Sequence, residues 1–152
     1  MTVVRLWHKD LLEVLPQKQL VSQWRECCAI ARNIAIEGSP NHILVNRIMD
    51  YPLEHFIRYS KKVQMAMIFR NYYCDYYNFS KWFTNREEIE RFWPAQITPI
   101  ELVRLKDDDI FYDWHNDRYY WQCYYNLEEK YDCGGISQDE WETICDEVCL
   151  RL

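Results

Sequence analysis

The chain has 152 residues, a formal net charge of −6 at pH 7, and 49% hydrophobic and 16% aromatic residues. This length is typical of one domain with its own core, so we expect residues 1–152 to form a single compact domain. Only three Gly occur, none of them between residues 39 and 133, which favours an all-α fold of several helices. No apolar run approaches the length of a transmembrane helix, which argues against a membrane-spanning chain.

Charge is unevenly distributed along the chain. Residues 1–70 carry ten Lys or Arg and six acidic residues, a balance of +4, whereas residues 71–152 carry eight and 18, a balance of −10. Nucleic-acid binding requires local positive potential rather than a basic total, so the first half is suited to a phosphate-binding face. The acidic second half counts against tight non-specific DNA binding.

The seven cysteines form an odd set that no signal peptide precedes, so we expect a reduced, cytoplasmic protein. Cys133, Cys145 and Cys149 with His115 offer a zinc-ligand set, but the chain has no Cys-x-x-Cys pair to anchor it. The adjacent acids at 107–109 converge poorly on a divalent ion and fit a solvated helix start better. We therefore expect neither a metal nor another cofactor.

The first long helix is predicted between Pro16 and Gly38. Pro16 is tolerated in a first turn, and Gly38 and Pro40 end the helix. Apolar residues recur at steps of three and four at Leu20, Trp24, Cys27, Cys28, Ala31, Ile34 and Ala35. One side of this amphipathic helix should therefore face the core.

Two polar lines run along the same helix at seven-residue spacing. Lys18, Arg25 and Arg32 form one line, and Gln19, Glu26 and Asn33 form the other. Because two helical turns separate successive members, a basic stripe lies beside a single carboxylate, that of Glu26. Cations beside one acid suit a phosphate-bearing substrate, and an ordinary solvated face is the alternative.

Further helices are predicted over 51–73, after Pro52, and over 85–93, before Pro94. The aromatic run 72–83 has helical spacing and should contribute to the core. Arg58, Lys61, Lys62 and Arg70 crowd the polar side of the helix over 51–73. They either extend a phosphate-binding face or only keep the protein soluble.

The second long helix is predicted over 110–131, and Ser137 and Glu140 form a capping box that starts a last helix. In the second long helix Tyr120, Tyr124 and Leu127 lie on one face and Trp121, Tyr125 and Glu128 on the next. One face should pack, and the other is free to stack on bases.

Residues near the N-terminus and in the first helix resemble the pyrimidine-dimer DNA glycosylases of the phage endonuclease V type. The matching residues are Arg5-Leu6-Trp7-His8, Leu15-Pro16, Gln19-Leu20, Trp24-Arg25-Glu26 and Asn41-His42. Detailed similarity covers roughly the first 70 residues, and beyond them only the family's aromatic, helical character continues.

The resemblance implies a terminal α-amine as nucleophile and Glu26, in the pair Arg25-Glu26, as the residue that assists it. If Met1 is removed, Thr2 carries the amine. Alternatively Val4 is a misread start, and the chain begins with Met in its place and continues at Arg5. Thr2, Glu26 and Arg25 are thus the expected catalytic residues.

The expected substrate-binding residues are Arg5, His8, Lys18, Gln19, Arg32 and His42. His8 and His42 lie near the ends of elements that can approach Glu26, where they would contact phosphate or assist proton transfer, although a structural role is the alternative for each. Trp7 and Trp24 are candidates for a wedge that distorts DNA, with Trp24 better suited to the core.

The resemblance therefore implies a DNA-repair glycosylase with abasic-site lyase activity on cyclobutane pyrimidine dimers. Its partner would be double-stranded DNA that carries UV lesions or abasic sites. The alternative is a non-catalytic interaction module on the same fold, which binds a protein partner through the acidic, aromatic C-terminal half.

Overall fold

The computed structural model describes residues 5–83 and 105–152, and these residues form helices and connecting turns without a strand, which confirms the all-α fold class. The elements are η1 (Lys9–Val14), α1 (Gln17–Glu37), η2 (Asn46–Asp50), α2 (Leu53–Phe69), α3 (Tyr77–Ser80), η3 (Lys81–Phe83), η4 (Asp107–Asp109), α6 (Asp117–Asp132) and α7 (Gln138–Arg151). The helix expected over 85–93 lies outside the described residues. Within them, no helix has the length and apolar character needed to cross a membrane.

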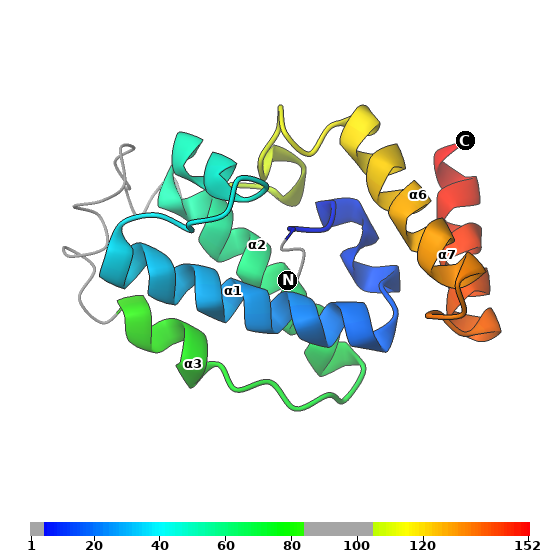
Figure 1. The fold of residues 1–152 in the computed structure, drawn as a ribbon, viewed down its shortest axis with the longest axis horizontal. Coiled ribbons are helices and arrows are strands. Elements are labelled where there is room, and N and C mark those ends of the chain that lie inside the picture. The colour runs from blue at the N-terminus through cyan, green and yellow to red at the C-terminus, as the bar shows by residue number, and fades with distance from the viewer. Residues whose placement is uncertain (1–4, 84–104) are drawn as a thin grey trace.

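The first long helix, α1, crosses the front of the molecule, with α2 behind it and α3 below it, while α6 and α7 lie side by side beyond its N-terminal end (Figure 1). Its ends are those predicted. Pro16 precedes the first turn, and Gly38 adopts φ 76° and donates its N–H to the carbonyl of Ile34 at 3.0 Å. A left-handed residue after the last turn suits Gly, which has no Cβ to clash there.

The predicted apolar stripe of α1 packs against α2. Leu20, Trp24, Cys27, Ala31 and Ile34 are buried, and Phe56, Tyr59 and Val63 are buried on the facing helix. Gln23 is also buried, at a position where the periodicity predicts an apolar residue. Its amide must therefore find partners inside the protein.

The second helix, α2, ends at Phe69, four residues before the predicted end at Tyr73. Asn71 adopts φ 60°, and the N–H of Tyr72 turns back to the carbonyl of Met67 at 2.9 Å. Asn is one of the few residues that tolerates this left-handed conformation, so it closes the helix as Gly would. The aromatic residues that follow form a turn and the short α3, in which Phe79 is buried as part of the core.

The helix α6 begins at Asp117, seven residues after the predicted start at Ile110. Phe111 adopts φ 49°, which interrupts a helix. The side chain of Asn116 then accepts a hydrogen bond from the N–H of Tyr119 at 2.9 Å and caps the new helix. This N-cap sets where α6 starts.

Removing the cap of α6 should destabilise the protein. We expect Asn116→Ala to lower the free energy of unfolding by about 1 kcal/mol, because the N–H of Tyr119 loses its partner. Urea unfolding followed by circular dichroism measures this change. Gln122→Ala, an exposed substitution inside the same helix, is the control and should change stability by less than about 0.5 kcal/mol. Equal stability of the two variants would contradict the assignment of the cap.

Three aromatic residues of the C-terminal half join α6 to α7. Trp141 stacks on Tyr131 with ring centroids 5.0 Å apart and on Tyr124 at 5.6 Å. The predicted capping box is confirmed, because Ser137 and Glu140 cap each other at the start of α7. Much of the aromatic content therefore serves packing rather than binding.

Three cations on α2 or directly after it bind groups of other elements. Arg58 and Lys62 lie 3.5 Å and 3.9 Å from the carboxylate of Asp107. Arg70 donates hydrogen bonds to the carbonyls of Leu15 and Glu13, each at 2.6 Å. The acids at 107–109 form the exposed turn η4, and in the described part of the chain no group of His, Cys, Asp and Glu could hold a metal ion.

Candidate functional site

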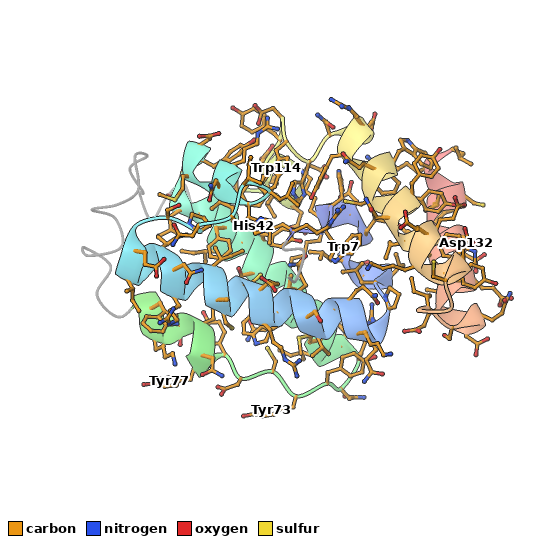
Figure 2. All side chains as sticks on the ribbon, viewed as in Figure 1. Trp7, His42, Tyr73, Tyr77, Trp114 and Asp132 are labelled. Atoms are coloured by element: carbon orange, nitrogen blue, oxygen red, sulfur yellow. The ribbon has the colours of Figure 1, made fainter. Side chains whose placement is uncertain are left out.

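A cavity of about 450 Å³ lies between the segment Arg5–Trp7, the exposed side of α1, and α6. We call it the Glu26 cavity. Four residues that the sequence indicated line it, namely Arg5, Lys18, Gln19 and Glu26. Figure 2 shows the Trp7 side chain in the space between α1 and α6, where its ring forms part of the wall. The cavity thus joins the start of the described chain to the middle of α1.

The Glu26 carboxyl is half-buried in this cavity. Burial raises its pKa above the ordinary value, and the positive charge that His42 carries when protonated opposes this rise. His42 comes from the loop after α1, and its Nδ1 accepts a hydrogen bond from the N–H of Leu44 at 3.3 Å. A carboxyl with a raised pKa that faces a cavity stays protonated to a higher pH than a free Glu, which suits it to proton transfer.

The segment Arg5–Trp7 is fixed to the body of the protein by side chains. The Gln23 side chain accepts a hydrogen bond from the N–H of Trp7 at 2.7 Å and donates one to the carbonyl of Arg5 at 3.0 Å. These bonds satisfy the buried amide and hold the segment one helical turn before Glu26. Gln23 could have been recognised in the sequence as a polar residue on the apolar side of α1, between Leu20 and Cys27.

The structure does not place His8 in the cavity. Its side chain is fully buried, with Nε2 2.9 Å from the carbonyl of His115 and Nδ1 accepting the N–H of Asp10 at 3.1 Å. Burial lowers its pKa to about 4, so the ring is neutral at pH 7. Both ring nitrogens are therefore engaged inside the protein, and His8 is not among the residues that line the Glu26 cavity.

The basic line of α1 divides between two hollows. Lys18 lines the Glu26 cavity, whereas Arg25 and Arg32 line a separate hollow of about 390 Å³ between α1 and α3. Arg25 and Glu26 are adjacent in sequence and so point about 100° apart around the helix axis. Tyr73 and Lys81 line the same hollow as Arg25. Thr2, the expected carrier of the amine, lies outside the described residues.

Cations from later elements extend the surface around Arg5. Another hollow, of about 290 Å³, is lined by Arg5, Arg47 and Arg118 together with Trp114. On the other side, α6 contributes Lys130 and also the acidic Glu129 to the Glu26 cavity. The sequence did not single out four of these charged residues, Arg47, Arg118, Glu129 and Lys130, because they meet the N-terminal segment only in the folded chain.

Neither Trp7 nor Trp24 is exposed enough to act as a wedge in this structure. Trp24 is buried and stacks near Tyr76 and Phe79, at 6.5 Å and 5.7 Å between ring centroids, as a core residue does. Tyr125 on α6 is 60% exposed and lines a shallow hollow with Trp121 and Arg118. The rings available for stacking near the cavity therefore come from α6.

Comparison with known proteins gives one family. A family model described as pyrimidine dimer DNA glycosylase matches residues 4–80. The match runs from the N-terminal segment through α3, so it includes Arg5, Glu26 and His42 but not α6. Searches of curated proteins and of solved structures found no match.

Proposed function

This chain belongs to the pyrimidine dimer DNA glycosylase family, and we propose on this basis that it is a DNA-repair glycosylase with abasic-site lyase activity. The proposed substrate is a cyclobutane pyrimidine dimer in double-stranded DNA. One observation carries the proposal: the chain approaches its N-terminus in the same cavity that holds the Glu26 carboxyl.

The proposed nucleophile is the α-amine at the start of the chain, on Thr2 or on the residue that precedes Arg5. An α-amine has a pKa of about 7.7–8.0, against about 10.4 for Lys, so roughly a tenth of it is neutral at pH 7. Thr2 lies three residues before Arg5, a span of at most roughly 11 Å of extended chain. Both candidate positions are therefore within three residues of Arg5, which lines the same cavity as Glu26.

The amine nitrogen would attack C1′ of the damaged nucleotide, and the bond from C1′ to the base would break, so that the base leaves with the electron pair and a proton. Opening of the sugar ring leaves an imine between the amine and C1′. Removal of a C2′ proton then breaks the bond from C3′ to the 3′ phosphate by β-elimination. Glu26 would stabilise the cationic imine and transfer protons in these steps.

The cations around the cavity would hold the DNA backbone. Arg5 and Lys18 line the same cavity as Glu26, and Gln19 and His42 supply further polar groups. Arg25 and Arg32 would contact phosphates on the other side of the helix, next to the α3 hollow. Phosphate contacts of this kind set the position and orientation of the duplex rather than its sequence.

The contribution of each side of α1 can be measured separately. We expect Lys18→Ala to weaken binding of an abasic duplex several-fold and to reduce the slope of log Kd against log salt concentration by about 0.9. Lys61→Ala, an exposed cation on α2, is the control and should change neither. Fluorescence anisotropy at several salt concentrations gives both quantities. Arg25→Ala should show the same loss as Lys18→Ala if the duplex spans both sides of α1.

The experiment that tests the proposed function is borohydride trapping on a duplex with one abasic site. Borohydride reduces the imine to a stable adduct, and mass spectrometry of the trapped peptide identifies the residue that carries the amine. We expect an adduct on the first residue of the mature chain. Absence of an adduct, with the DNA left intact, would contradict the proposal and favour a non-catalytic interaction module that uses the acidic α6 and α7.

A further inference from the structure

Three side chains hold the backbone of Arg5–Trp7, and we infer that they form a clamp that positions the N-terminal amine over Glu26. We call Gln23, Tyr59 and Tyr119 the clamp. None of the three is among the residues that the sequence indicated for the site. The inference rests on the proposed function, and it assigns these residues a positioning role and not a catalytic one.

The clamp engages four backbone groups of the segment. Gln23 binds the carbonyl of Arg5 at 3.0 Å and the N–H of Trp7 at 2.7 Å. Tyr119 donates its hydroxyl to the carbonyl of Leu6 at 2.6 Å, and Tyr59 donates to the carbonyl of Trp7 at 2.5 Å. Each bond thus acts on the backbone, so it fixes the path of the chain whatever its side chains are.

The clamp is rigid because its members also support one another. The hydroxyl of Tyr59 lies 3.0 Å from the Gln23 Oε1 that accepts the N–H of Trp7. Gln23 and Tyr59 are buried, and burial raises the pKa of Tyr59 and of Tyr119, so both phenols stay protonated and continue to donate. Segments near a chain end are ordinarily mobile unless they are tied down, and Arg5–Trp7 is tied from three elements, α1, α2 and α6.

The clamp lies close to Glu26, the residue proposed to assist the amine. Gln23 is three residues before Glu26 on α1, a rise of about 4.5 Å along the helix axis. The carbonyl of Arg5 is therefore held by the side chain one helical turn before Glu26, and Arg5 and Glu26 line the same cavity. A nucleophile held close to its reaction geometry gains rate by proximity, and a misplacement of about 1 Å can lower the rate roughly a hundredfold.

The test separates positioning from binding and from folding. Tyr119→Phe and Gln23→Leu remove clamp bonds and keep the shape of the side chain, while Tyr131→Phe removes a hydroxyl of the same kind that bonds Gln138 between α6 and α7. We measure the single-turnover rate of borohydride trapping on saturating abasic duplex, the Kd for a duplex with an uncleavable tetrahydrofuran site, and hydrogen exchange at the Trp7 amide.

The clamp variants should trap at least about tenfold more slowly, with Kd changed by less than about twofold, whereas Tyr131→Phe should match the wild type. Exchange at the Trp7 amide should accelerate in Gln23→Leu and stay slow in Tyr131→Phe. If Gln23→Leu does not fold, Tyr119→Phe retains both Gln23 bonds and still tests the trapping rate.

Two results would overturn the inference, and they differ from each other. Wild-type trapping rates in variants whose Trp7 amide exchanges faster would show that the clamp does not position the amine, and the proposed function would stand. No trapping by the wild-type protein would remove the proposed function, and the inference with it.

Discussion

Glu26→Gln should lower the rate of strand nicking at an abasic site by roughly 10²–10⁴-fold, the range expected when a general acid or base is removed. The amide keeps the size of the side chain but can neither take up nor release a proton near neutral pH. Glu26 is only half-buried and lies on the cavity side of α1, so the fold should be unaffected. Single-turnover nicking and thermal melting of the same preparation measure the two effects.

Glu37→Gln is the matched control for this variant. Glu37 is an exposed glutamate in the last turn of the same helix, and its side chain accepts a hydrogen bond from Asn41. It should nick abasic DNA at the wild-type rate. Nicking by Glu26→Gln at the rate of this control would remove Glu26 from the proposed mechanism.

The stability of the protein should fall steeply as the pH drops from 6.5 towards 4. His8, His55 and His115 are buried, and burial is the main cause that lowers the pKa of each. The unfolded chain takes up protons at these residues near pH 6.5, whereas the folded protein does not. Because the unfolded state binds more protons, stability decreases with falling pH in this interval.

The size of the effect follows from the pKa of His8, which burial lowers to about 4. At pH 5 this single residue costs about 2 kcal/mol of folding free energy relative to pH 7, and His55 and His115 act in the same direction. Well above pH 6.5 all three are neutral in both states and the effect vanishes. Urea unfolding at pH 7, 6 and 5 measures the dependence, before most carboxylates titrate.

A variant isolates the contribution of His8. His8 caps η1 by accepting the N–H of Asp10, and Asn can accept the same hydrogen bond without titrating. We expect the free energy of unfolding of His8→Asn to fall less steeply between pH 6.5 and 5. Near pH 5 the slope should correspond to close to one proton fewer taken up on unfolding than in the wild type. A slope in His8→Asn equal to that of the wild type would contradict the prediction.

Structural features that depend on a few neighbouring residues were predicted well from the sequence. The limits of α1 follow from Pro16 and Gly38, and the start of α7 follows from Ser137 and Glu140. The short motif around Arg25-Glu26 indicated the family that the family model confirms. These features depend on neighbours within one or two helical turns, so no knowledge of the rest of the fold is needed.

The ends of the other helices were predicted less well. Asn71 ends α2 early and Asn116 starts α6 late, in each case because a short polar side chain favours a turn over the continued apolar periodicity. The prediction followed the hydrophobic pattern on either side of these two Asn residues and gave them too little weight. The signal for each helix end was therefore local, but hydrophobic periodicity alone does not reveal it.

By itself the sequence determined the all-α class, the central helix and the presence of Glu26 beside cations. Only the tertiary structure decided which polar residues face the cavity and which are buried. Gln23 meets Trp7 across 16 residues, His8 meets His115 across 107, and Tyr119 meets Leu6 across 113. A polar side chain in the interior is fixed by the partner that satisfies it, and that partner is brought near only when the whole chain packs.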